Sequence, residues 1–405
     1  MRIDIRVEPP GSNARKIVSI IDNLCAKSTF TYPLVIHDGE GCYIRDVDDN
    51  IYLDFTSNIC STPLGYSHQA VISVLKEYSN NGAHKIAGQD FYSIEHAKLA
   101  EKILSIVPNN FKVFFINSGA EAVENAIKVA YRYTKKSVGL SCIGAFHGRT
   151  LGALTFTYSK QVHKKDYPEL PVKRIRFNSV EELDELKDLS NISFIIIEVI
   201  QGESGYNIAS KPFIDKIHKI SKEQGIPLIV DEVQSGMGRT GRWWAYQHYG
   251  IEPDIMSVAK GLQVGATLYN KRFDPEAGAI SSTWGGGHRI DMAIGAAIID
   301  TIEREHLLDN ARDMGAILLK RFKEIKDRFD VIVDVRGIGL MIGLEFVTSK
   351  IRDDIIHNSF KRGLLLLPGG SKAIRIAPPL IIGKDEIDEG LYVFEDVLKR
   401  SILSS

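Results

Sequence analysis

The segment PLIVDEVQSGMGRTG, residues 227–241, places two acidic residues directly after a run of aliphatic residues. A short aliphatic run of this kind is typical of a strand that is buried on both faces of a sheet. A carboxylate at the end of such a strand costs free energy unless a cation or a hydrogen-bond donor meets it. Asp231 therefore needs a partner, and the surrounding sequence indicates which one.

Short apolar runs like this one alternate with helical patterns from about residue 95 onward. The helical pattern of residues 94–107 is followed by apolar runs at residues 112–119, 137–142, 193–200, 226–233 and 254–261. Short buried strands that alternate with helices predict an α/β fold, with a mostly parallel central sheet covered by helices on both faces.

The two chain ends have a different pattern. Residues 42–57 predict an antiparallel pair of strands joined by an Asp-Asn turn, and a charged helical region spans residues 299–329. Residues 331–346 predict a hairpin, and two further apolar stretches and a final helix follow it. We predict an N-terminal segment at residues 1–60, a large domain at residues 61–300 and a C-terminal segment at residues 301–405. The first and last segments would form one smaller α/β domain.

The composition argues against several classes of protein. The 405 residues carry a formal net charge of −1, whereas a nucleic-acid-binding surface needs an excess of Lys and Arg. No stretch approaches the roughly 18 uninterrupted apolar residues of a membrane helix, and residues 1–16 lack the apolar core of a secretion signal. The four cysteines lack the spacing of a zinc site or a disulfide framework. We expect a cytoplasmic protein without a metal, nucleic-acid or membrane partner.

Polar residues follow the predicted strands where each strand ends. These residues are Ser118, Glu198, Asp231 and Lys260. Ligands of open parallel sheets bind at the carboxyl ends of the strands. Polar residues at several strand ends therefore predict a ligand site at this edge of the sheet.

The helix after Ser118 begins with a capping pattern. Ser118 and Glu121 have the spacing at which the two side chains satisfy amides at a helix start. Gly119 lets a ligand approach the backbone, and free amides at a helix N-terminus bind phosphate with help from the helix dipole. The same residues are equally consistent with a helix that is only well capped.

An aliphatic strand followed by Asp-Glu also occurs in P-loop ATPases, but those proteins need a GxxxxGK[ST] loop. The only Gly-Lys pair here, Gly383-Lys384, is followed by Asp385. Lys260 instead ends an apolar strand. Most lysines are solvated surface groups, but a lysine in a desolvated pocket has a lowered pKa and can form a Schiff base.

A phosphate cradle, a carboxylate and a lysine are together what pyridoxal phosphate requires. The cradle anchors the phosphate, the carboxylate keeps the pyridine nitrogen protonated, and the lysine carries the cofactor as an imine. Asp231 would then have the protonated ring as its cation.

The chain resembles the class-III aminotransferases, the pyridoxal-phosphate family that includes 4-aminobutyrate, ornithine and acetylornithine aminotransferases. Seven motifs in the family's order carry this resemblance across nearly the whole chain. They are NSGAEAVE (117–124), AFHGRT (145–150), EVIQGESG (198–205), DEVQSGMGRTG (231–241), SVAKGL (257–262), STWGG (282–286) and IRIAPPL (374–380). The resemblance implies the type-I fold of pyridoxal-phosphate-dependent aminotransferases and a homodimer with its sites at the subunit interface.

The resemblance also implies the roles of the residues that hold the cofactor. Lys260 bonds to it and moves the proton, Asp231 pairs with the pyridinium nitrogen, and Glu198 supports the site from behind. The other contacts are Val233 beneath the ring, Gln234 at the ring oxygen, Phe146 on the opposite face with His147 beside it, Ser118, Gly119 and Ala120 at the phosphate, and Thr283 at the phosphate of the partner subunit. Without the neighbouring motifs, Phe146 and Val233 are more simply explained as core residues.

Two arginines and one acid match the positions that handle substrates. Arg149 and Arg375 match the residues that bind substrate carboxylates, a task that suits the two-pronged guanidinium group. Glu203 matches the acid that neutralises Arg375 when a donor has no carboxylate there, since leaving that arginine unpaired would cost roughly 3–5 kcal/mol. The alternative is that Glu203 is only a loop residue.

Three departures from the family pattern bear on the substrate. Val199 replaces the usual Pro after Glu198, Ser204 replaces Gly after Glu203, and Trp284 replaces the Phe that commonly follows Thr283. The STWGG motif is similar to that of lysine 6-aminotransferases. These changes affect the choice of donor rather than the cofactor chemistry.

We therefore predict an aminotransferase that moves the terminal amine of an ω-amino acid to a 2-oxo acid, 2-oxoglutarate above all. The first donor is 4-aminobutyrate, and ornithine, lysine and acetylated or carrier-linked diamino acids are alternatives. An amino-acid racemase or aminomutase on the same fold stays open. A non-catalytic binding protein is disfavoured because Lys260 is present.

Overall fold

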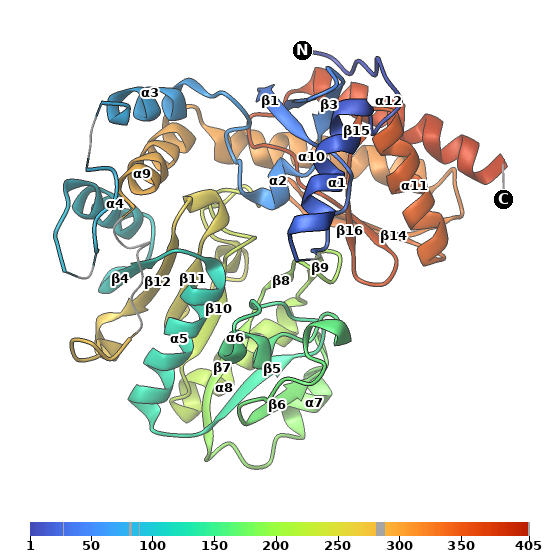
Figure 1. The fold of residues 1–405 in the computed structure, drawn as a ribbon. Helices are drawn as coiled ribbons and strands as arrows, with labels where there is room; N and C mark the ends of the chain where they lie inside the picture. The colour runs from blue at the N-terminus through green and yellow to red at the C-terminus, as the bar shows by residue number, and fades with distance from the viewer. Residues whose placement is uncertain (27, 81–82, 89, 281–287, 404–405) are drawn as a thin grey trace. The chain divides into compact units, whose positions relative to one another are not determined.

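The computed structural model describes residues 1–403 apart from residues 27, 81–82, 89 and 281–287 (Figure 1). The described residues fall into two compact units. One consists of residues 70–306, and the other combines residues 1–69 with residues 307–405. None of the described helices is both long enough and apolar enough to cross a lipid bilayer.

The unit of residues 70–306 is built on a seven-stranded sheet with the order β4-β12-β11-β10-β7-β5-β6. Its strands are β4 (Phe111–Ile116), β5 (Val138–Cys142), β6 (Val172–Ile175), β7 (Ile192–Ile197), β10 (Leu228–Asp231), β11 (Ile255–Val258) and β12 (Gly265–Asn270). Parallel pairing joins β11 to β10, β10 to β7, β7 to β5 and β5 to β6. The predicted, mostly parallel sheet is therefore confirmed.

The sequence pattern did not predict β6 or β12. β12 is antiparallel to both of its neighbours, β11 and β4. Only residues 259–264 separate it from β11. A parallel neighbour needs a crossover of a dozen or more residues, so this short connection forces the chain to return antiparallel.

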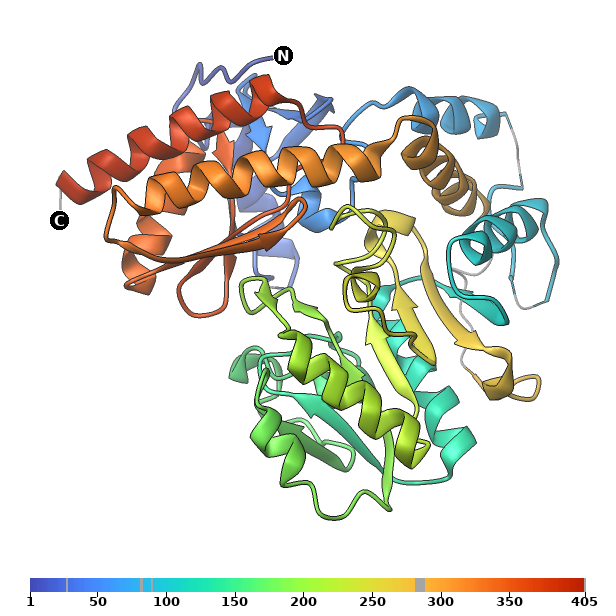
Figure 2. The same cartoon turned by 180° about the vertical axis from the view of Figure 1, so that it is seen from behind.

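Helices cover both faces of this sheet. The helices between residues 69 and 306 are α3 (Gln69–Tyr78), α4 (Ile94–Ser105), α5 (Gly119–Thr134), α6 (Leu151–Phe156), α7 (Val180–Asp184), α8 (Lys211–Gln224) and α9 (Arg289–Arg304). Helix α5 lies on the near face in Figure 1, and α8 lies on the near face in Figure 2, which views the sheet from behind. The apolar stripe of α5, which includes Val123 and Ile127, forms one core cluster with Phe194, Ile229 and Ile255 of the strands.

The second unit contains two four-stranded sheets. One has the order β1-β2-β3-β15 and the other β13-β14-β17-β16. Their strands are β1 (Ile36–Glu40), β2 (Tyr43–Asp46), β3 (Ile51–Asp54), β13 (Ile332–Ile338), β14 (Met341–Phe346), β15 (Leu364–Leu365), β16 (Leu367–Gly369) and β17 (Ala373–Ile376). The helices are α1 (Ser12–Leu24), α2 (Ser57–Cys60), α10 (Leu307–Lys326), α11 (Ser349–Lys361) and α12 (Lys384–Leu403). The predicted strand pairs of residues 42–57 and 331–346 are both present.

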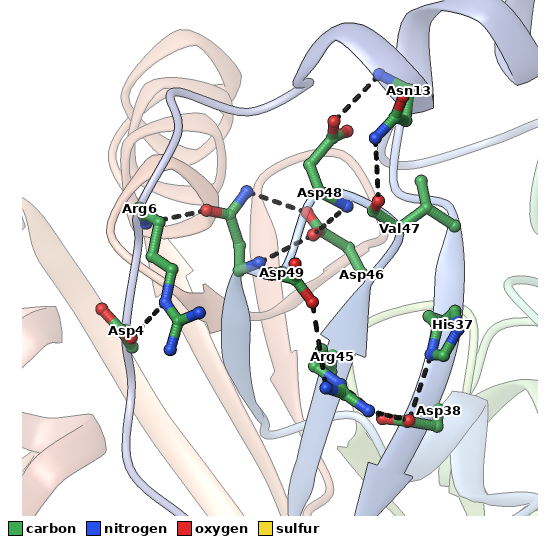
Figure 3. A network of polar contacts seen from close by, with 11 residues as sticks. Asp4, Arg6, Asn13, His37, Asp38, Arg45, Asp46, Val47, Asp48 and Asp49 are labelled. Carbon is green, nitrogen blue, oxygen red and sulfur yellow. Dashed lines mark hydrogen bonds and ion pairs between the residues drawn. The ribbon is translucent and has the colours of Figure 1, made fainter.

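The turn between β2 and β3 is specified by the carboxylate of Asp46, as Figure 3 shows. This side chain accepts hydrogen bonds from the amide of Asp48 at 2.9 Å and from the amide of Asn50 at 2.8 Å. Asp49 adopts the left-handed backbone conformation, with φ of 64°. Asp and Asn tolerate this conformation and hydrogen-bond to nearby amides, so the sequence alone predicts the turn.

The charged helical region predicted at residues 299–329 is interrupted. Helix α9 ends at Arg304 and α10 begins at Leu307. His306 has φ of 53°, and its amide donates to the carbonyl oxygen of Glu303 at 3.1 Å. A left-handed residue of this kind ends a helix, so the region forms two helices rather than one.

Candidate active site

Asp231 is the last residue of β10, and its side chain is buried. Because β10 lies between β7 and β11, a carboxylate at its end needs donors from the protein or from a ligand. Its Oδ1 accepts a hydrogen bond from the Val233 amide at 3.0 Å, and its Oδ2 lies 2.8 Å from Nδ1 of His147. The structure therefore gives Asp231 a histidine partner that the sequence analysis did not assign to it.

His147 is buried as well, and its backbone holds it in place. Its amide donates to Oγ1 of Thr157 at 2.9 Å, and that hydroxyl donates to the carbonyl oxygen of Gly148 at 2.8 Å. Within the described part of the chain, no group forms a hydrogen bond with the buried Nε2 of His147. A buried ring nitrogen in this state indicates that a polar group from outside the described residues completes the site.

The N-terminus of α5 has the capping geometry that the sequence predicts. Oγ of Ser118 accepts the amide of Glu121 at 3.3 Å, and the Glu121 carboxylate accepts the amide of Asn117 at 3.1 Å. The loop after His147 lies against this helix start, since a Cβ on Gly148 would lie 2.7 Å from Cβ of Ala120. Gly148 has φ of 125°, so both its conformation and this close contact require glycine.

Three of the predicted elements meet at Gly119, the first residue of α5. A Cβ added there would lie 2.8 Å from Cγ1 of Val233 and 3.5 Å from Cβ of Ala259. Val233 is two residues beyond Asp231, and Ala259 directly precedes Lys260. The start of α5 and the segments after β10 and β11 are therefore in contact at one edge of the sheet.

Lys260 is half-buried and has φ of 42°. Its carbonyl oxygen accepts the amide of Gln263 at 2.9 Å and the Gln263 side-chain amide at 3.0 Å. A left-handed conformation costs a residue with a side chain roughly 1–2 kcal/mol, and such residues are concentrated at functional sites. The turn after β11 thus holds the backbone of Lys260 in the left-handed conformation, which is not a strand conformation.

Glu198 follows β7 and is buried beside Asp231 and His147. Its Oε2 accepts the Phe146 amide at 2.8 Å and its Oε1 accepts the Gly202 amide at 2.9 Å. Burial raises the pKa of this carboxyl to about 7, with the His147 charge acting in the opposite direction. Glu198 thus joins the loop of Phe146 to the start of a hairpin formed by β8 (Ile200–Gln201) and β9 (Asn207–Ile208).

Gln234 is buried close to the same hairpin. A Cβ on Gly202 would lie 2.3 Å from Oε1 of Gln234, so a side chain there would displace the Gln234 amide. No group among the described residues forms a hydrogen bond with that buried amide oxygen. Together with Nε2 of His147, it is a second buried polar atom available to a ligand.

Arg149 and Glu203 belong to the same unit. Arg149 is exposed, and Glu203 lies half-buried in the turn of the hairpin. His163 shares their electrostatic surroundings: burial lowers its pKa, Arg149 and Lys160 lower it further, and Glu203 raises it. The ring of His163 also contacts the ring of Phe146 edge-on, with centroids 5.8 Å apart.

Two predicted residues lie elsewhere. Arg375 belongs to the other unit, where it is buried in β17 and its Nε donates to the carbonyl oxygen of Pro368 at 3.0 Å. Thr283 lies outside the described residues. The roles of both in substrate and phosphate binding stay predictions.

Sequence reasoning missed Thr157 and His163 and gave Glu232 no role. Thr157 lies in neither of the nearby motifs, and its bond to His147 depends on how α6 returns the chain to that loop. His163 lies in a mostly exposed stretch outside the seven motifs, so no pattern in the sequence marked it. Glu232 did carry one, since it is the second acid after a buried strand.

This arrangement fits pyridoxal phosphate. Gly119 packs closely on Val233 and Ala259 at the start of α5, and the amides of a helix start can bind a phosphate. The carboxylate of Asp231 ends β10, and the amine-bearing Lys260 follows β11 by two residues. The model that describes the family Aminotransferase class-III matches residues 24–398. The chain belongs to the class-III aminotransferases. The family resemblance and the cofactor predicted from the motifs are thereby confirmed.

Several known proteins resemble this class-III aminotransferase over nearly its whole length. An acetylornithine aminotransferase of Archaeoglobus fulgidus is 36% identical over 367 residues, which cover 89% of this chain and 94% of that protein. An alanine/serine racemase of Pyrococcus horikoshii is 32% identical over an alignment that covers 98% of this chain and 93% of that protein.

The solved structures include the lysine aminotransferase from M. tuberculosis in the internal aldimine form. It is 26% identical, has a TM-score of 0.90, and the match covers 96% of this chain and 99% of that one. The type-I fold is therefore confirmed, and the chain is a pyridoxal-phosphate-dependent aminotransferase.

Proposed function

We propose that this enzyme transfers the terminal amino group of an ω-amino acid to 2-oxoglutarate, giving a semialdehyde and glutamate. The observation that carries the proposal is the meeting of the α5 N-terminus with the segments that bear Asp231 and Lys260. The acetylornithine and lysine aminotransferases among the similar proteins support a donor with a terminal amine.

In this proposal, bound pyridoxal phosphate supplies the electron sink for the bond that breaks at the amine-bearing carbon. Asp231 keeps the ring nitrogen protonated, and Nζ of Lys260 takes the proton from the amine-bearing carbon and later returns one. Ser118, Gly119 and Ala120 at the start of α5 would hold the phosphate. Val233 and Phe146 would cover the two ring faces, and Gln234 would bind the ring oxygen.

Substrate carboxylates are the proposed task of Arg149 and Arg375. Glutamate and 2-oxoglutarate carry a carboxylate beside the reacting carbon, whereas a terminal-amine donor does not. Glu203 would neutralise Arg375 in the second case and move aside in the first, so that no charge stays unpaired in a closed site. We also propose a homodimer in which Thr283 completes the phosphate site of the partner subunit.

Among terminal amines, we propose a diamino acid of the ornithine type, with N-acetylornithine first and lysine and ornithine next. The similar acetylornithine aminotransferases favour this class over 4-aminobutyrate, the first donor in the sequence-based prediction. 4-Aminobutyrate stays in the set because Arg149 can hold its carboxylate at the far end.

The decisive experiment is a donor screen with 2-oxoglutarate, in which glutamate is measured for N-acetylornithine, ornithine, lysine, 4-aminobutyrate and alanine. We expect kcat/KM for the best terminal amine to exceed that for alanine by at least tenfold. Equal or better turnover of alanine would overturn the proposed donor class.

A second candidate activity is amino-acid racemisation, because the similar Pyrococcus horikoshii protein is an alanine/serine racemase. Incubation of L-alanine and L-serine without any oxo acid, followed by chiral chromatography, separates the two activities. We expect no enantiomer to form. Formation of the D-amino acids at a rate above that of transamination would favour the racemase.

A further inference from the structure

The β8–β9 hairpin, in which β8 (Ile200–Gln201) pairs with β9 (Asn207–Ile208), is bonded to the loop that precedes Phe146. Glu203 lies in its turn. The amide of Gly205 donates to the carbonyl oxygen of Gly202 at 3.2 Å, which closes the turn. The pairing is only two residues long, so contacts outside the hairpin must hold the turn in place.

Two side chains of the hairpin bond to consecutive carbonyl oxygens of that loop. Nε2 of Gln201 donates to Ile143 O at 3.0 Å, and Oγ of Ser204 donates to Gly144 O at 2.5 Å. The contact is close, because a Cβ on Gly144 would lie 2.8 Å from Oε1 of Gln201 and 3.0 Å from Oγ of Ser204. Gly144 also has φ of 87°, so the loop presents a bare backbone to the hairpin.

The anchors on either side of Glu203 differ in kind. On its N-terminal side, the buried carboxylate of Glu198 accepts the Gly202 amide. On its C-terminal side, the first side-chain anchor is the Ser204 hydroxyl. The family pattern commonly has Gly at this position, and glycine would leave the backbone after Glu203 without this bond.

We infer that Ser204 is a positioning residue that fixes Glu203 in the conformation used with terminal-amine donors, and so biases the enzyme toward them. The inference rests on the proposed function, in which Glu203 neutralises Arg375 for such donors. Without the Ser204 hydroxyl, the Glu203 backbone has more freedom, so the neutralising position is occupied for a smaller fraction of the time. Binding of 2-oxoglutarate requires Glu203 to leave that position, so the KM for 2-oxoglutarate would fall.

The first measurement does not depend on activity. Hydrogen exchange of the amides of residues 199–209 is compared by mass spectrometry in the wild-type holoenzyme and in Ser204→Ala. Because one neutral hydrogen bond contributes about 1 kcal/mol, we expect roughly three- to tenfold faster exchange in the variant. Unchanged exchange would overturn the inference whatever the substrate is.

Ser221→Ala is the matched control for this measurement. Oγ of Ser221 also donates to a backbone carbonyl oxygen, that of Ile226, at 2.7 Å, but it lies near the end of α8. We expect this control to leave exchange of residues 199–209 and both KM values within twofold of the wild type. Ser204→Thr, which keeps the hydroxyl, should restore slow exchange.

The second measurement is a double-mutant cycle on the two half-reactions. In Ser204→Ala, we expect the ratio of KM for the terminal-amine donor to KM for 2-oxoglutarate to rise three- to tenfold. In Glu203→Ala, adding Ser204→Ala should leave that ratio unchanged, because the hydroxyl acts through Glu203. An equal rise in both backgrounds, or none in the wild-type background, would overturn the inference.

The two measurements separate the possible failures. If the wild type turns over no terminal amine although Ser204→Ala speeds exchange, the proposed function fails and the bond stays established as the anchor of the hairpin. If the wild type is an ω-aminotransferase and the cycle shows no coupling, only the inferred role of Ser204 fails.

Discussion

Asp231 and Glu232 are consecutive buried carboxylates, but their surroundings differ. Glu232 accepts hydrogen bonds from the hydroxyl of Ser235 at 2.6 Å and from the amides of Ala245 and Tyr246 at 3.1 and 2.9 Å. Asp231 accepts one backbone amide and faces the ring of His147. Glu232 thus joins two stretches of its own chain, whereas Asp231 has a titratable partner.

Two uses of a buried acid can be distinguished by the part of the chain that supplies its hydrogen-bond partners. The donors around Glu232 come from the segment that follows it, and a Cβ on Gly236 would lie 2.7 Å from the Glu232 carbonyl oxygen. Such a carboxylate organises the fold of its own loop. For Asp231, a buried carboxylate whose partner is a histidine 84 residues away, we propose a role in the chemistry instead.

The largest expected effect is that of Asp231→Asn. In the proposed mechanism the variant loses the charge that pairs with the cofactor's ring nitrogen, and losing one partner of a buried ion pair costs about 3–5 kcal/mol. We expect kcat with the best donor to fall roughly 10²- to 10⁴-fold, measured by glutamate formation, with little change in Tm. If Asp231→Asn kept a tenth of the wild-type kcat, the proposed difference in role between Asp231 and Glu232 would be wrong.

Glu232→Gln should show the opposite behaviour. Its amide nitrogen cannot accept a hydrogen bond from the Ala245 amide or from the Ser235 hydroxyl, so these buried donors lose their partner. We expect the free energy of unfolding at pH 5 to fall by about 3 kcal/mol in urea titrations. The folded variant should keep kcat within about threefold, and a loss as large as that of Asp231→Asn would assign Glu232 to the chemistry.

The pH dependence of stability sharpens the comparison. Burial raises the pKa of Glu232 from 4.5 to about 7, so between these values the folded protein binds more protons than the unfolded one. The contribution of Glu232 to stability is complete below pH 4.5 and is lost as pH rises through 7. Glu232→Gln has no titrating group at this position and does not lose stability in this way. The difference in free energy of unfolding between wild type and variant should therefore narrow by about 2 kcal/mol from pH 5 to pH 8. A constant gap would contradict the raised pKa.

The smallest effect is expected for Ser235→Ala, which removes one of the three donors to Glu232. The free energy of unfolding should fall by about 1 kcal/mol, the typical worth of one hydrogen bond. Because that donor lowers the pKa of Glu232, its loss should also move the upper end of the pH window to higher pH. Activity should stay at the wild-type level, and a change in the pH profile of kcat would link Ser235 to Asp231.

Much of the candidate site follows from short-range patterns. The cap of α5 depends on residues three positions apart, and the end of β10 depends on one aliphatic run. Other features depend on distant parts of the chain. The contact of Gly119 with Val233 and Ala259 requires three strand ends to meet, and the bond from Ser204 to Gly144 joins residues 60 positions apart.

By itself, the sequence determined the strand and helix pattern, the positions of Asp231 and Lys260 at strand ends, and the family, because hydrophobic periodicity and contiguous motifs are local properties. Only the tertiary structure decided that His147 pairs with Asp231 and that the Glu203 hairpin is bonded to the loop before Phe146. Those outcomes depend on which buried polar groups come within hydrogen-bonding distance after the sheet has formed, and no local pattern encodes that distance.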